Sequence, residues 1–323
     1  MIPKYLACLL IALGSGAAAL CHELLWTRRL IDILGATGEA TSLTLGCFFC
    51  GLSLGAAIAA RRVAHLRNAW SSLARLEFAI ALLTLPAAFL PLWTSWIWPA
   101  LGPDALITWP GRVVKLFLSG LVVLPPATAM GMTLPVLVVA ASRTIANNPR
   151  LHVFIYACNT LGGALGLLSA SIWMLPSLGV LGSMVFAAVL NSGVGVAALA
   201  LSYQLPNTLY PQTKREKKRQ AAAGRTVQPL PQSWLMAWAC YSGFAVLALE
   251  IVVIRLLSLV VPSSFQATSS VLLAVIFLLG VAALVVPALV RLVPKPGLLL
   301  LLLIACAGVA NAWAPWLLHQ RTK

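Results

Sequence analysis

The chain is a succession of apolar stretches, each long enough to cross the hydrocarbon core of a membrane. Charged residues make up only 9% of its 323 residues, while hydrophobic residues make up 61%. Globular domains carry roughly 25% charged residues because their surfaces face water, whereas a membrane helix needs about 20 mostly apolar residues. The sequence therefore predicts an all-α polytopic membrane protein with the lipid bilayer as its main partner.

Nine stretches are long enough to be transmembrane helices. The fourth contains Pro125 and Pro126, which predict a kink or break at a point where neighbouring groups satisfy the backbone. Three regions follow from the spacing: a six-helix bundle at 1–203, a basic linker at 204–232 and a bundle of three helices at 233–323. The predicted spans are 4–26, 41–60, 71–92, 113–140, 153–175, 178–203, 233–260, 267–292 and 297–318.

Lysine and arginine residues divide unequally between the two sides of these spans. Fourteen fall on the side of the N-terminus and six on the other side, while Arg75 and Arg255 lie inside spans. Cytoplasmic loops carry the excess of basic residues, so the N-terminus is predicted to be cytoplasmic. The net charge of +15 resides in these loops, which argues against nucleic-acid binding. The basic cluster at 214–219 is interpreted as a cytoplasmic linker that controls topology or contacts anionic lipid.

A set of polar residues recurs at an offset of 227 positions, counted from Ser15 to Ser242. Both copies contain Ser, Gly, Ala, Leu and Glu at matching positions without a gap, and they end at Glu23 and Glu250. Six predicted spans separate the starts of the copies, and an even number gives both copies the same direction across the membrane. That is the parallel repeat of major-facilitator transporters, here with an incomplete second half of three helices.

Further motifs follow in a fixed order: MGMTLP at 130–135, YACNTLGGALG at 156–166 and LPSLG at 175–179. Together with the segment from Ser15 to Arg28, they resemble the transmembrane portion of bacterial fused major-facilitator/spermidine-synthase-like proteins. The resemblance covers about 15–180 and resumes at 241–290. It implies a multi-pass protein of the bacterial plasma (inner) membrane, a small cationic ligand such as a polyamine, and a cytoplasmic aminopropyltransferase-like domain or partner.

In that family the membrane region is followed by an aminopropyltransferase-like domain of Rossmann type, and this chain has no glycine-rich nucleotide signature and only seven acidic residues. Catalysis by this chain alone is therefore not expected, and neither a cofactor nor a metal is predicted. Two functions stay open: a transporter-like module for a small cation, and a non-transporting membrane anchor or scaffold for an aminopropyltransferase-like domain or partner. A remnant without activity of its own is the least favoured interpretation.

Glu23 and Glu250 are the first candidate site residues, because a charge in hydrocarbon costs roughly 2.5–3.5 kcal/mol and needs a partner or a purpose. Arg28 and Arg255 follow five residues later, about 140° around the helix. We therefore expect cross-pairing of Glu23 with Arg255 or of Glu250 with Arg28. Structural ion pairs are slightly favoured over carboxylates that bind a cation or a coupling proton. A transporter predicts a water-accessible central cavity lined by both glutamates and Asn159, and a scaffold predicts a tightly packed centre.

The fifth predicted span contributes the remaining candidates, Tyr156, Asn159 and Thr160. They are followed by Gly162 and Gly166, a pair of small residues at a spacing that permits close helix contact. Asn159 is predicted either to line a cavity or, as the favoured interpretation, to form hydrogen bonds between helices.

Other polar residues in the spans carry less weight. Arg75 and Glu77 are interpreted as interfacial side chains that reach toward water. Cys47 and Cys50 form a C-x-x-C pair, which is interpreted as packing because small buried cysteines are ordinary in apolar helices. His22 could shuttle a proton, but a single histidine is weak evidence.

Overall fold

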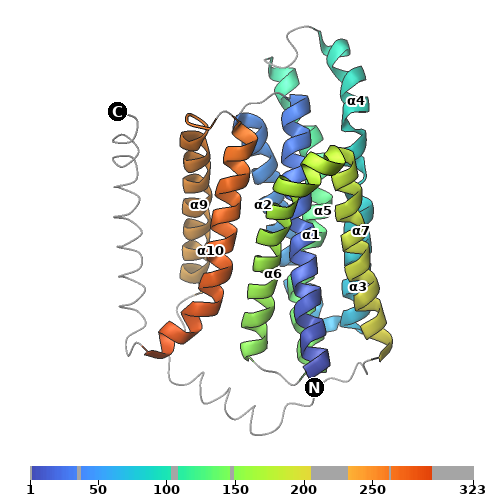
Figure 1. Ribbon diagram of the computed structural model, residues 1–323, viewed down its shortest axis with the longest axis vertical. Coiled ribbons are helices and arrows are strands. Elements are labelled where there is room, and N and C mark those ends of the chain that lie inside the picture. The colour runs from blue at the N-terminus through green and yellow to red at the C-terminus, as the bar shows by residue number, and fades with distance from the viewer. Residues whose placement is uncertain are drawn as a thin grey trace. The chain divides into compact units, whose positions relative to one another are not determined.

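The computed structural model describes residues 2–34, 38–102, 108–145, 149–204, 232–261 and 263–292, and these are helical without any strand (Figure 1). The chain divides into two compact units, Met1–Gly280 and Val281–Lys323. The elements are α1 (Ile2–Leu34), α2 (Gly38–Arg62), η1 (Val63–His65), α3 (Ala69–Leu83), α4 (Pro86–Leu101), α5 (Trp109–Thr144), α6 (Pro149–Ser169), η2 (Ala170–Met174), α7 (Leu175–Gln204), α9 (Gln232–Leu257) and α10 (Ser264–Leu292).

Seven segments of the described chain are long and apolar enough to cross a membrane. One of them, Arg150–Gln204, has 55 residues and would be far longer than the roughly 30 Å hydrocarbon core as a single straight helix. Gly179 interrupts it with a φ of 66°, and α6 and α7 run in opposite directions (Figure 1). Of the nine predicted spans, seven fall largely on helical segments, 71–92 crosses the interruption between α3 and α4, and 297–318 lies outside the described residues.

The sequence predicts a kink or a break at Pro125 and Pro126, and a break does not occur: α5 continues as one helix through both prolines to Thr144. The neighbouring helix α2 packs against this part of α5 at backbone distance. A Cβ atom added to Gly55 would collide with the backbone of Thr128. Close packing of this kind supports a proline-containing helix that would be weaker alone.

A second close helix pair joins α1 to α6. A Cβ atom at Gly16 would collide with the backbone of Asn159, and one at Gly162 or Gly166 would collide with the backbone of α1. The spacing of the small residues on α6 predicts a close contact between helices. The structure confirms it, because the backbones of α1 and α6 lie directly against each other at these glycines.

The two copies of the sequence repeat lie on α1 and α9, which run in the same direction, while α2 and α10 run the opposite way (Figure 1). Apolar packing connects α9 and α10 with the first bundle. Ile254 of α9 and Leu272 of α10 belong to the same buried cluster as Trp26 and Leu24 of α1.

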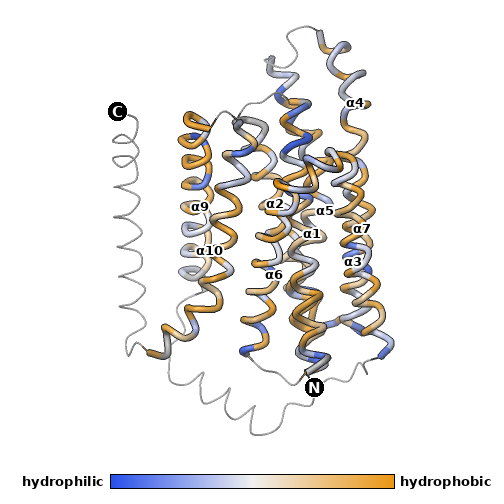
Figure 2. The backbone as a smooth tube through the Cα atoms, in the orientation of Figure 1, coloured by the Kyte–Doolittle hydropathy of each residue, from blue (hydrophilic) through white to orange (hydrophobic). Residues whose placement is uncertain are grey.

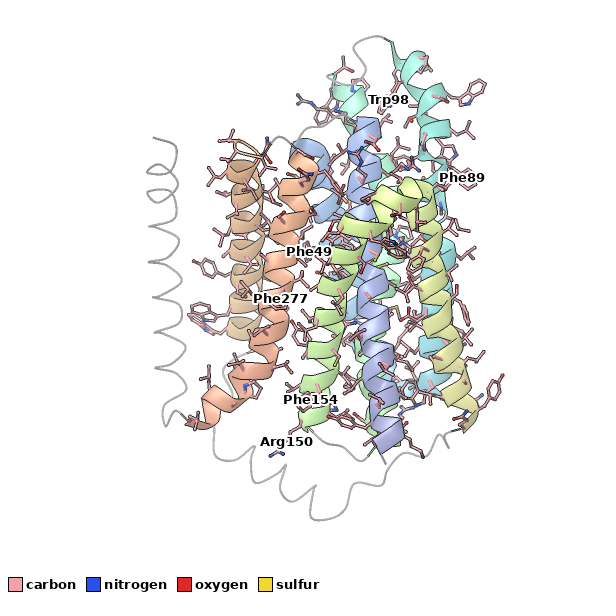
Figure 3. All side chains as sticks on the ribbon, viewed as in Figure 1. Phe49, Phe89, Trp98, Arg150, Phe154 and Phe277 are labelled. Carbon is pink, nitrogen blue, oxygen red and sulfur yellow. The ribbon has the colours of Figure 1, made fainter. Side chains whose placement is uncertain are left out.

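Apolar side chains also cover the outside of the helices. Figure 2 shows hydrophobic residues along the lengths of the helices, with hydrophilic residues concentrated near several helix ends. Phe89, Phe154 and Phe277, labelled in Figure 3, are 53%, 42% and 51% exposed. An apolar exterior on helices of this length is what contact with lipid requires, which supports a multi-pass membrane protein.

Candidate functional site

Glu23 on α1 and Glu250 on α9 are buried and lie within electrostatic range of each other. Their exposed fractions are 1% and 5%, and Glu250 lies close enough to Glu23 to act on it electrostatically. The Oε1 atom of each has no hydrogen-bond partner. The repeat therefore places two equivalent acids in the protein interior, and each has a buried oxygen without a hydrogen-bond partner.

The predicted cross-pairing with arginine is wrong. Arg28 Nη2 lies 3.2 Å from Asp32 Oδ1, one turn further along the same helix, and Arg255 is exposed. Within the described ranges, no ion pair connects Glu23 or Glu250 with an arginine. A partner four residues away is available without crossing between helices, and a long arginine side chain can extend out of an apolar core.

Arg28 also makes a contact with α10, since its guanidinium carbon lies 5.6 Å from the centroid of the Phe265 ring. This cation–π geometry connects the end of α1 with the beginning of α10. Arg28 thus contributes to packing between the two copies of the repeat through an aromatic ring and not through a glutamate.

Glu77 on α3 is a third buried acid, and it is completely enclosed. Ser15 Oγ donates a hydrogen bond of 2.6 Å to Glu77 Oε1, and Asn191 Nδ2 donates one of 2.6 Å to Glu77 Oε2. Asn191 Oδ1 in turn lies 3.0 Å from His22 Nε2. We call Ser15, Glu77, Asn191 and His22 the polar network; it connects α1, α3 and α7.

The interfacial position predicted for Glu77 is therefore wrong. Helix α3 begins at Ala69, where the Asn68 side chain accepts a hydrogen bond from the Ser71 N–H, so Glu77 lies two turns inside the helix. Arg75 is exposed and donates to the Ser71 carbonyl of its own helix. Since the two side chains are two positions apart, they point in different directions, and only the glutamate enters the bundle.

His22 is fully buried and stacks on Trp26, with ring centroids 5.7 Å apart and an angle of 21° between the rings. Its Nδ1 atom has no hydrogen-bond partner, and neither does Trp26 Nε1. His22 faces Asn191 of α7, whereas the adjacent Glu23 interacts with Glu250 of α9. His22 and Glu23 are adjacent on α1, but they belong to two separate groups: the polar network and the acid pair of Glu23 and Glu250.

Tyr156, Asn159 and Thr160 do not join either group. Asn159 Nδ2 donates to the Ala12 carbonyl of α1 at 3.2 Å, the hydrogen bond between helices that the favoured interpretation predicts. Thr160 Oγ1 donates to the Tyr156 carbonyl of its own helix, and the Tyr156 side chain is 38% exposed. Asn191 on α7 belongs to the polar network but was not predicted from the sequence. Its only signal in the sequence is an amide side chain in the middle of an apolar stretch.

Glu250 lines a groove of about 320 Å³ between α9 and α10. Neither Glu23 nor Asn159 is among its lining residues, so this groove is not the predicted central cavity. Apart from Glu250 and Ser270, its lining is apolar. The lining residues are Val246, Leu249, Glu250, Val253, Leu257, Ser270, Val271, Ala274 and Val275.

No group of three or more His, Cys, Asp and Glu side chains within the described ranges could hold a metal ion. Cys47 and Cys50 are free thiols, the first buried and the second exposed. No protein-family model, no curated protein and no solved structure matches this chain. Its function is therefore inferred from its own residues.

Proposed function

We propose that the chain is an integral membrane transporter-like module that binds a small cation at Glu23 and Glu250. The observation that carries this proposal is the approach of two buried acids whose Oε1 atoms have no hydrogen-bond partner and which have no basic partner in the described structure. Buried carboxylates require a compensating charge or a proton. A cation that replaces a proton at this pair satisfies that requirement.

The architecture that we propose is a major-facilitator-like parallel repeat of six plus three spans with a cytoplasmic N-terminus. The common direction of α1 and α9 supports it, as does the equivalent position of Glu23 and Glu250 in the repeat. Transporters built from repeats bind substrates and coupling ions where the repeats meet, near the middle of the bilayer. One carboxyl group of the acid pair comes from each copy of the repeat, which supports a binding site where the two copies meet.

Amine cations are the ligand class that this pair suits best. Carboxylates form strong charge-assisted hydrogen bonds with ammonium groups, and two carboxylates can share one such group. A polyamine is the candidate that the family resemblance implies, and a bacterial plasma (inner) membrane is the location that it implies.

A second candidate function is a non-transporting membrane anchor or scaffold for an aminopropyltransferase-like domain or partner. The close packing of α1 favours it: Gly16 meets the backbone of α6, and the polar network ties α1 to α3 and α7. A helix held on several sides suits a rigid support. The acid pair has no role in this candidate, which makes the two candidates separable.

The experiment is uptake of radiolabelled spermidine and of a simple monoamine into proteoliposomes that contain the full chain. Glu23→Gln and Glu250→Gln are each expected to reduce uptake by about tenfold or more, because each removes a charge-assisted contact. Asp32→Asn is the matched control, since it neutralises a partly exposed acid outside the pair, and it should transport like the wild type. Uptake of neither amine by a correctly folded wild-type protein would support the scaffold.

A further inference from the structure

We propose that the groove between α9 and α10 binds a hydrophobic amine, a single ammonium group on an apolar body, with Glu250 as its counter-ion. This inference rests on the proposed function and narrows its ligand from a small cation to one chemical class. It differs from the polyamine that the family resemblance implies, because it requires one charge and a large apolar surface.

The acid supplies the charge complementarity. Glu250 is 95% buried, and its Oε1 atom has no hydrogen-bond partner although the residue lines the groove. No ion pair within the described chain neutralises it. An ammonium group in the groove would supply the positive charge that the Glu250 carboxyl group lacks.

The side chains that line the groove determine the chemistry of the rest of the ligand. Val246 and Leu249 of α9 and Val271 and Val275 of α10 line the groove, and Ser270 is its one uncharged polar side chain. A polyamine bound here would place a second ammonium group against aliphatic side chains without a counter-ion, which is strongly unfavourable in an apolar environment. A ligand with one charge and a hydrocarbon body avoids that cost and gains from burial of its apolar surface.

Size and access agree with a small molecule. A volume of about 320 Å³ lies at the lower end of the range for small-molecule sites, and it is too small for a helix about 10 Å across. Leu249 and Val253 are 41% and 38% exposed on the apolar exterior, so a ligand can enter from the hydrocarbon side. Amphipathic amines concentrate in that phase, with their charged ends near polar groups.

Binding is measured by equilibrium dialysis of radiolabelled 4-phenylbutylamine with the full chain in phosphatidylglycerol nanodiscs, and binding to empty nanodiscs is subtracted. We expect saturable binding that Glu250→Gln weakens by about tenfold or more. Ala274→Phe, which adds bulk to the groove and keeps the acid, should weaken it similarly. Asp32→Asn should bind like the wild type, and uncharged 4-phenylbutanol should compete about tenfold less well than the amine.

Two further measurements complete the test. One distinguishes a lipid headgroup from a free amine as the natural ligand, and the other distinguishes failure of this inference from failure of the proposed function. Phosphatidylethanolamine added to the nanodiscs should compete if the natural amine is a lipid headgroup and should have no effect if it is a free amine; both results support the site. Binding that survives both Glu250→Gln and Ala274→Phe overturns the inference. Binding of spermidine in preference to phenylbutylamine, with dependence on Glu23 and Glu250, overturns the inference and leaves the proposed function intact. Binding of neither amine overturns both.

Discussion

The Glu77 carboxylate accepts a hydrogen bond from Asn191 Nδ2 at 2.6 Å, which joins α3 to α7 across 114 positions of sequence. Its other oxygen accepts from Ser15 Oγ on α1, also at 2.6 Å. All three side chains are buried, so water cannot replace these bonds when one partner is lost. The Glu77 carboxyl group on α3 therefore connects that helix by hydrogen bonds to both α1 and α7.

Glu77→Ala should destabilise the protein because it leaves Ser15 and Asn191 with unsatisfied buried donors, at about 1–3 kcal/mol for each. Glu77→Gln keeps the shape and one strong acceptor, so it should cost clearly less. Thermal unfolding in detergent, followed by tryptophan fluorescence, measures both changes. An alanine variant that unfolds at the wild-type temperature would show that the polar network contributes nothing to stability.

The two glycines at equivalent positions of the repeat should respond differently to the same substitution. Gly16→Ala places a methyl group against the backbone of Asn159 and should cost about 1–3 kcal/mol through overpacking. Gly243→Ala meets no atom within 4 Å and should be neutral or slightly stabilising, because alanine is the better helix former. The same unfolding assay compares them, and equal effects at both positions would contradict the different packing of α1 and α9.

Neutralising both members of the acid pair should not weaken the fold. Neither Glu23 nor Glu250 has a basic partner in the described structure, so Glu23→Gln/Glu250→Gln removes no ion pair and lowers the cost of placing charge in hydrocarbon. We expect an unfolding temperature equal to that of the wild type or above it. A large loss of stability in this double variant would assign the pair an architectural role and remove the basis of the transport proposal.

Arg28→Gln should have only a small effect, below about 1 kcal/mol. The side chains of Arg28 and its partner Asp32 are 40% and 37% exposed, and ion pairs with that much access to solvent contribute little. Arg255→Gln, at an exposed position, should be equally mild. A buried cross-pair with a glutamate would instead cost about 3–5 kcal/mol when broken, a difference that thermal unfolding resolves.

Hydropathy and spacing were enough to predict the helices and one of their contacts. Long apolar stretches leave few alternatives to membrane helices, and the spacing of Gly162 and Gly166 predicts the close approach to α1 that the structure confirms. Asn159 forms its predicted bond between helices because an amide in such a contact has few other partners.

The polar groups could be predicted only in part, because their partners are distant in sequence. Glu77 lies 62 positions from Ser15 and 114 from Asn191, so a charged residue near the beginning of a span could not be distinguished from an interfacial one. The partner of Arg28 depended on how α1 is rotated within the bundle, which packing determines and periodicity alone does not. The repeat was more informative for Glu23 and Glu250, since it identified two acids that the fold brings near one another.

The different surroundings of the repeated Ser-Gly pair have a consequence for assembly. Ser15 and Gly16 are covered by α3 and α6, whereas Ser242 donates to the Ala239 carbonyl of its own helix and a Cβ atom at Gly243 would meet no neighbouring element within 4 Å. A methyl group added at Gly243 would meet no atom of another helix that the structure describes. The second copy of the repeat thus leaves uncovered the small-residue position that the first copy uses for contact with a neighbouring helix.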